Sequence, residues 1–558
     1  MHKATLFRRL AAVAAPPVAA AIVAARAALS ALAAFAAVAA LAAAVPAAAA
    51  AADDHPGAPS PSLIEACKVD VKGDKKDEWK REPKAQSSVT QHHLAAGGKV
   101  VDYSATAGTL VIRDDEDKPT ANIGYVAYTR RDVKDAGQRP ILFAFNGGPG
   151  SSSMWLHMGV LGPRRVTVSD PGPTPAAPYR TVDNEFGVLD KSDLVMIDPV
   201  GVGLSRAVCD HKDDEFWGVD PDIESISRFI AQYLSDNNRW SSPKYLLGES
   251  YGTTRAAGIA DYLRERRNVS FNGLILISVA TDIEMVSAEV PGNDRPYAAF
   301  LPAYAAAGWY HHVLPHQPAE LEPFLQEVRT YAQGPFATAL QKGDKLSDAE
   351  MDAVANQVHE YTGLSVQYLK EANLRVGENQ FVHELLRSQR KTVGRLDSRY
   401  AGPTLDPLKK DAEYDPQSAA ISAAYTAAFM DYYHGELKFG QGETYRETNY
   451  SIGDKWKMTH RPIGADTDQP VVNSNVDLAD DLVQDANLRV LVLAGYYDLA
   501  TPFSATEYVM AHLGVPRELS SHIQIKYYEA GHMMYVHPPS LKKFKGDLDA
   551  FIDSTMHP

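Results

Sequence analysis

The chain contains very little cysteine, because Cys67 and Cys209 are the only thiols among its 558 residues. An oxidising, exported compartment could join this pair in a disulfide. The alternative is two independent buried side chains that act as small hydrophobic groups. The sequence leaves both readings open, because it does not show whether the two Cα atoms come close enough to be bridged.

Positive charge is also scarce. The 55 Lys and Arg residues are outnumbered by 70 Asp and Glu residues, which gives a formal net charge of −15 at pH 7. Such a surface repels phosphate backbones, so the composition argues against a nucleic-acid partner. The chain is nevertheless 45% hydrophobic and 22% charged, which is typical of a globular protein with a sizeable core.

The first 52 residues contain no Asp or Glu, and their basic residues are three near the start and Arg26. A long Ala-rich run that ends in "AVPAAAAAA" completes the pattern of a secretory signal peptide over residues 1–52. We therefore expect an exported protein, periplasmic or secreted, without stable membrane association after cleavage. The alternative is a retained anchor, since residues 27–45 are uncharged and nearly span the ~30 Å of hydrocarbon. Residues 53–66 are predicted to be a flexible leader.

Short apolar runs later in the chain are typical of strands buried on both faces of a parallel sheet. They cover residues 141–145, 193–198, 245–248, 273–278 and 489–495. Helical periodicity over 223–234 separates two of these runs, and strand followed by helix and strand is the pattern of an α/β sheet.

Other parts of the chain have a different character. Residues 88–130 alternate in the manner of antiparallel strands. Residues 284–486 read as a mostly helical cap inserted between two parts of the core, 67–283 and 487–558. The domain plan predicted from the sequence is therefore one α/β core interrupted by one helical insertion.

The stretch "GESYG" places Ser250 between an apolar strand and a helical pattern. This context predicts a nucleophile elbow, in which glycines allow a sharp turn that presents the serine hydroxyl. A serine needs a base and an orienting acid, and His532 and Asp498 each follow a predicted strand. The chain order Ser, Asp, His is that of α/β-hydrolases. Taken singly, Asp498 could be a solvated turn residue and His532 a surface histidine.

The loop "NGGPGSSS", residues 146–153, follows another predicted strand and offers backbone N–H groups for an oxyanion hole. Its glycines allow close approach of the backbone to a substrate. A phosphate-binding loop is the competing interpretation. It is disfavoured because the Gly-x-Gly-x-x-Gly spacing and a following Lys are both absent.

Together with "IDPVGVGLS" (197–205), these motifs resemble those of the serine carboxypeptidase family, peptidase family S10, in a bacterial-type member. The resemblance implies an α/β-hydrolase fold: a central, mostly parallel sheet flanked by helices, with an inserted helical cap. It also implies roles for particular residues. They are Ser250, His532 and Asp498 as catalytic triad, the N–H groups of Gly148 and Tyr251 as oxyanion hole, Asn146 and Glu249 as binders of the substrate carboxylate, and Met533 as a leaving-group contact.

Two positions depart from the family pattern. Ala144 stands where family carboxypeptidases carry a Trp, and Val160 stands where they carry a second Glu that supports the first. These changes keep open an esterase or acyltransferase that uses the same triad. A third possibility is a secreted binding protein on an inactive hydrolase scaffold, which the complete set of catalytic elements disfavours.

The function predicted from the sequence is a serine carboxypeptidase-like hydrolase. It would remove C-terminal residues from peptides with a free C-terminus through an acyl-enzyme on Ser250. We expect no cofactor and no metal. The histidines of "YHHVLPH" (310–316) do not change this expectation, because Pro315 breaks the helical spacing of ligands.

Overall fold

The computed structural model describes residues 84–96, 99–287 and 291–556. The predicted signal peptide and leader lie outside the described residues. So does Cys67, and its disulfide with Cys209 therefore stays a prediction. Among the described residues, no helix combines the length and the apolar character that crossing a membrane requires.

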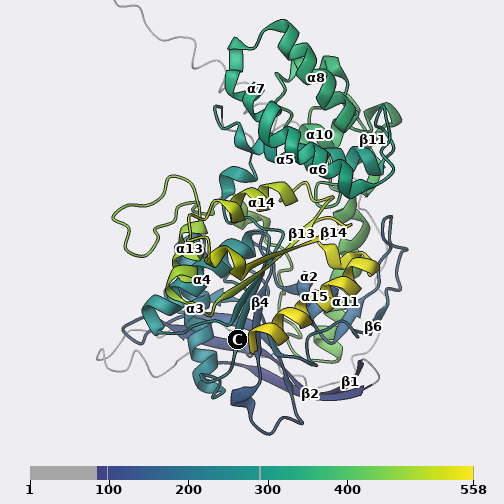
Figure 1. The fold of residues 1–558 in the computed structure, drawn as a ribbon. Coiled ribbons are helices and arrows are strands. Elements are labelled where there is room, and N and C mark those ends of the chain that lie inside the picture. The colour runs from purple at the N-terminus through teal and green to yellow at the C-terminus, as the bar shows by residue number, and fades with distance from the viewer. Residues whose placement is uncertain (1–83, 97–98, 288–290, 557–558) are drawn as a thin grey trace, which may run out of the picture. The chain divides into compact units, whose positions relative to one another are not determined.

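A ten-stranded sheet forms the centre of the fold (Figure 1). Its order is β1-β2-β3-β7-β4-β9-β10-β13-β14, and β8 (Arg206–Ala207) pairs with β3 off this path. The strands β1 to β3 and their pairing with β7 are antiparallel, whereas β7, β4, β9, β10, β13 and β14 run parallel. Their bounds are β1 Ser87–Ala96, β2 Lys99–Arg113, β3 Pro119–Arg130, β4 Ile141–Phe145, β7 Asp193–Ile197, β9 Lys244–Glu249, β10 Gly273–Ile277, β13 Arg489–Gly495 and β14 Ile523–Tyr528.

Both faces of the sheet are covered, which explains why its central strands are continuously apolar. In β4, Leu142 and Ala144 belong to one hydrophobic cluster, and Phe143 and Phe145 belong to another. The first cluster includes side chains of α11 (Pro416–Gly435) and α15 (Pro538–Met556). The second includes side chains of α3 (Val219–Asp236), α4 (Tyr251–Arg267) and α13 (Asn475–Gln484). This arrangement confirms the predicted α/β-hydrolase fold.

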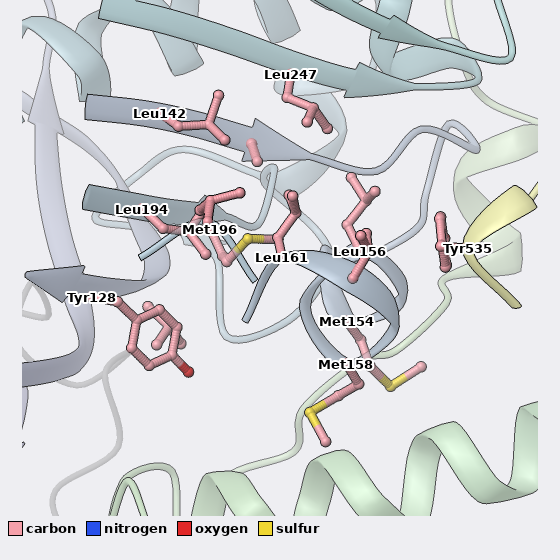
Figure 2. Packing of buried hydrophobic residues seen from close by; sticks show 14 of the residues in the cluster. Tyr128, Leu142, Met154, Leu156, Met158, Leu161, Leu194, Met196, Leu247 and Tyr535 are labelled. Atoms are coloured by element: carbon pink, nitrogen blue, oxygen red, sulfur yellow. The ribbon is translucent and has the colours of Figure 1, made fainter. Parts of the chain in front are cut away.

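A short helix, α2 (Met154–Leu156), continues into a π-helical turn, η3 (His157–Leu161), directly after the glycine-rich loop. Figure 2 shows Leu156 and Leu161 on the side of strand residues Leu142 and Leu194, whereas Met154 and Met158 point away from these strands. Burial of this segment ties the end of the loop to the core.

The helices of the predicted insertion, 284–486, divide among four clusters. The smallest contains Ile452 of α12 (Tyr450–Gly453) together with Val202 and Trp217. A third cluster joins the helices from α5 to α10 to residues around the end of β13, including Tyr497 and Leu499. By contrast, α11 and α13 contribute to the first and second clusters of the main sheet. The elements of the insertion are α5 Arg295–Tyr310, α6 Leu321–Tyr331, α7 Ala337–Lys342, α8 Asp348–Thr362, α9 Val366–Glu371, α10 Glu378–Glu384, β11 Lys391–Val393, β12 Ala401–Pro403, α11, α12 Tyr450–Gly453 and α13, with α14 Phe503–Ala511 after it.

Candidate active site

Ser250 occupies the sharp turn between β9 and α4. Its backbone has φ 60° and ψ −129°, a conformation that residues with a Cβ rarely adopt. The turn is tight because Gly248 lies against Gly252: a Cβ on Gly248 would stand 2.0 Å from the Gly252 carbonyl oxygen. The Ser250 N–H donates to the carbonyl of Ile277 in β10 at 2.9 Å. The sheet thus holds the strained backbone of Ser250 in place. The turn presents the Ser250 side chain at the carboxyl edge of the sheet.

His532 follows β14 and Asp498 follows β13, and the two side chains meet. The distance from His532 Nδ1 to Asp498 Oδ2 is 2.8 Å. Asp498 is fully buried, and its Oδ1 accepts hydrogen bonds from the N–H groups of Ala500 (2.8 Å) and Thr501 (2.9 Å). Since the carboxylate is fixed and holds Nδ1, the imidazole turns Nε2 toward the open side as the proton acceptor.

Two opposing influences act on the His532 pKa. Burial disfavours the charged imidazolium, but the Asp498 carboxylate and Glu249 outweigh it, and the pKa lies above its usual value. Within the described part of the chain, Ser250 and His532 line one cavity without a hydrogen bond between them. Such bonds are often long in free enzymes and tighten when substrate binds.

The cavity has a volume of about 400 Å³. Its wall contains the predicted site residues other than Asp498, which lies behind His532. These are Asn146, Gly148, Glu249, Ser250, Tyr251, His532 and Met533. Trp155, Arg395, Ile421 and Tyr450 also line it and were not predicted. The last three come from residues 284–486, where no motif marked them.

The glycine-rich loop packs directly against the elbow. A Cβ on Gly147 would lie 2.5 Å from the Tyr251 nitrogen and 2.7 Å from the Gly252 nitrogen. Gly148 has φ 108°, which glycine adopts without strain. Among the described residues, neither the Gly148 N–H nor the Tyr251 N–H donates a hydrogen bond to another group. Both amides therefore remain available to an oxyanion, the role that the sequence predicts for them.

Replacing Gly147 by Ala should disturb this contact. The new methyl group would overlap backbone atoms of the elbow, which cannot move aside as a flexible side chain does. We expect a loss of about 1–3 kcal/mol in the free energy of unfolding. We also expect kcat to fall at least ~10-fold, because the donors of the oxyanion hole shift. Urea unfolding and kinetics on one purified variant would measure both, and a variant with wild-type values would show that the loop does not depend on this approach.

Buried side chains that no catalytic motif singled out hold the loop in place. Asp198 accepts hydrogen bonds at 2.8 Å from both the N–H and the hydroxyl of Ser153. Arg255, on α4, donates to the Asn146 carbonyl and to Asp222 Oδ2, both at 2.7 Å. Asp198, the Asp of the stretch 197–205, therefore supports the glycine-rich loop rather than contacting a substrate.

Glu249 is buried beside the nucleophile. Its Oε1 accepts a hydrogen bond from Asn146 Nδ2 at 2.8 Å, and Asn146 Oδ1 accepts from the Leu156 N–H at 3.0 Å. Glu249 Oε2 has no hydrogen-bond partner among the described residues, although Tyr535 lies close enough to influence the pKa. Burial raises the Glu249 pKa to about 7, against the lowering influence of His532 and these hydrogen bonds. Because Glu249 lines the cavity, a proton on its carboxyl group would give the cavity a hydrogen-bond donor for an anion.

The two departures from the family pattern lie in the apolar interior. Ala144 and Val160 are both fully buried in the first hydrophobic cluster. Neither position therefore offers a polar partner to Glu249.

In the histidine-rich stretch, His311 Nε2 lies 2.6 Å from the Ser398 carbonyl and His316 Nδ1 lies 2.6 Å from Glu360, so these rings face different partners.

Comparison with known proteins identifies the family. The model of the family described as serine carboxypeptidase matches residues 114–537, well over half of the chain. The chain belongs to the serine carboxypeptidase family. It is a carboxypeptidase-like serine hydrolase, as its motifs predict.

One solved structure agrees with the fold of this carboxypeptidase homologue. The chain is similar to the crystal structure of Kex1(delta)p, a prohormone-processing carboxypeptidase from Saccharomyces cerevisiae, with TM-score 0.50 and 16% identity over 81% of this chain and 91% of that one. It is also similar to a proline iminopeptidase of Mycobacterium smegmatis, with TM-score 0.32 and 13% identity over 84% and 99% of the two chains. No curated protein sequence matches the chain.

Proposed function

We propose that this protein removes C-terminal residues from peptides through an acyl-enzyme on Ser250. The observation that carries the proposal is the 2.8 Å contact between His532 Nδ1 and Asp498, behind the cavity that Ser250 also lines. A serine hydroxyl beside such a pair can lose its proton as it attacks a carbonyl.

The reaction follows in two halves. Ser250 Oγ attacks the carbonyl carbon of the last peptide bond, and its proton passes to His532 Nε2. The N–H groups of Gly148 and Tyr251 stabilise the oxyanion of the tetrahedral intermediate. His532 then gives the proton to the leaving nitrogen, and the C–N bond breaks. Water enters, loses a proton to His532 and hydrolyses the ester, which returns Ser250 to its starting state.

Glu249 and Asn146 would select substrates with a free C-terminus. The place of Glu249 in the cavity wall and its pKa of about 7 support a protonated carboxyl that donates a hydrogen bond to the substrate's carboxylate. An ionised Glu249 would repel the same group. Export to a periplasm or to the exterior belongs to the proposal as well, on the basis of the sequence of residues 1–52.

An esterase or acyltransferase is the second candidate. The apolar surroundings of Ala144 and Val160 favour it, because Glu249 lacks the second carboxyl that supports it in the family pattern. Such an enzyme would keep the triad and the oxyanion hole but would not require a carboxylate on the leaving group.

The test compares an N-blocked dipeptide with its C-terminal amide and its methyl ester, with Ser250→Ala as the blank. A carboxypeptidase should release the C-terminal residue from the free acid at least ~10-fold faster than it releases the amidated residue from the amide. That result would support the proposal. Cleavage of the ester alone would replace this proposal by the esterase reading. Product identification by mass spectrometry excludes internal cleavage as the source of the signal.

A further inference from the structure

Arg395 stands out in the wall of the catalytic cavity. Among the described residues that line the cavity, it is the only Lys or Arg, and Glu249 and His532 are the only Asp, Glu or His. The chain as a whole is acidic, with a formal net charge of −15. A guanidinium in this cavity therefore gives it a local charge opposite to that of the molecule.

The backbone around Arg395 is fixed between the two loops that carry the catalytic acid and base. The Arg395 N–H donates to Asp415 Oδ2 at 2.7 Å, and the Arg395 carbonyl accepts from the Leu499 N–H at 3.0 Å. The next carbonyl, that of Leu396, accepts from the His532 N–H at 2.6 Å. Arg395 thus keeps a fixed position beside His532, even though it lies in the helical insertion.

Most donors of the Arg395 guanidinium have no partner among the described residues. The side chain is 42% exposed, and its only ion pair with a described residue joins Nε to Glu378 Oε1 at 3.8 Å, beyond hydrogen-bond distance. A guanidinium presents five N–H donors in a planar fork that matches the two oxygens of a carboxylate. This side chain is therefore equipped to bind a carboxylate that enters the cavity.

The leaving residue of the substrate must lie on this side of the cavity, because His532 gives its proton to the leaving nitrogen. The charge of Arg395 also reaches His532, where it opposes protonation of the imidazole. We propose that Arg395 binds a carboxylate carried by the leaving residue. This inference rests on the proposed function, since it assigns that function a specificity determinant. The carboxylate would be either the substrate's C-terminal group or an acidic side chain of its last residue.

The experiment uses the Arg395→Gln variant and N-blocked dipeptides that end in Glu or Gln, each as free acid and as amide. If the side chain is bound, the wild type prefers Glu over Gln by about 10-fold and the variant loses this preference. If the C-terminal group is bound, the variant loses about 10-fold on both free acids and little on the amides. Either result supports the proposal. Arg390→Gln, an exposed position on the same segment and outside the cavity lining, is the matched control.

Two outcomes would overturn the proposal: unchanged kcat/KM on all four substrates, or an equal loss on all four, Gln amide included, which marks a structural role. Arg395→Lys, which keeps the positive charge but not the planar fork of donors, should retain part of the preference for the carboxylate.

A pair of esters separates this inference from the proposed function. If no peptide is cleaved, an acyl glycolate ester with a free carboxylate can still be compared with its methyl ester. A preference for the former that vanishes in Arg395→Gln would support Arg395 without peptidase activity, and equal rates in both proteins would reject it.

Discussion

Replacing Ser250 by Ala should lower kcat for a susceptible dipeptide by about 10⁶-fold, because the covalent route disappears and only binding and the oxyanion hole remain. Asp498→Asn should have a smaller effect, about 10⁴-fold, because the serine and the base are both kept. The loss that remains comes from the 2.8 Å contact between Asp498 Oδ2 and His532 Nδ1. An amide nitrogen in place of Oδ2 would hold the imidazole in the wrong tautomer. Release of the C-terminal residue, followed over long incubations, measures both effects.

A fluorophosphonate probe reports the same residue independently of any substrate. It should label the wild type and leave Ser250→Ala unlabelled, whereas Ser235→Ala, an exposed position on α3, should label normally. The melting temperature of each variant separates a chemical defect from unfolding. Normal labelling of Ser250→Ala would move the nucleophile elsewhere and remove the basis of the proposed mechanism.

The sequence predicted the sheet well because its strands are buried on both faces. The run 141–145 coincides with β4, and the run 489–495 coincides with β13. Parallel strands end on the same edge, so residues that follow them converge there whatever their separation in the chain. Ser250 and His532 could therefore be placed on one site before the structure was known.

Other parts could not be predicted, for physical reasons. Local signals are informative within residues 284–486: Ser347 and Glu350, at the spacing typical of a capping box, form one at the start of α8. Tertiary placement had no such signal, because an amphipathic helix does not reveal which partner buries its apolar face. The sequence could not show that α11 belongs with the main sheet, or that Arg395 lies beside His532. Similarly, the supports of the oxyanion loop, Asp198 and Arg255, depend on contacts between distant segments.

The pH dependence of the reaction should differ between substrates with and without a free carboxylate. His532 must be neutral to act as base, so hydrolysis of every substrate rises with pH through the pKa of this residue. Glu249 must be protonated to bind a carboxylate, so kcat/KM for the free acid falls again as pH rises through about 7. At pH 9, two units higher, about 1% of Glu249 is protonated and the loss is about 100-fold. The methyl ester should show the rising limb alone, measured against Ser250→Ala to remove alkaline hydrolysis.

Glu249→Gln tests the cause of the falling limb. A carboxamide can accept from Asn146 and donate to the substrate at every pH, so the free acid should now be cleaved at pH 9 as well as at neutral pH. Since Glu249 helps to raise the His532 pKa, the rising limb should also move to lower pH. Glu518→Gln, an exposed change of the same type, should keep the wild-type profile. If the acid and the ester gave superimposable pH profiles in the wild type, the proton on Glu249 would take no part in recognition. The carboxylate would then be bound by a group that does not titrate near pH 7. Arg395 is the candidate for that group in the cavity wall.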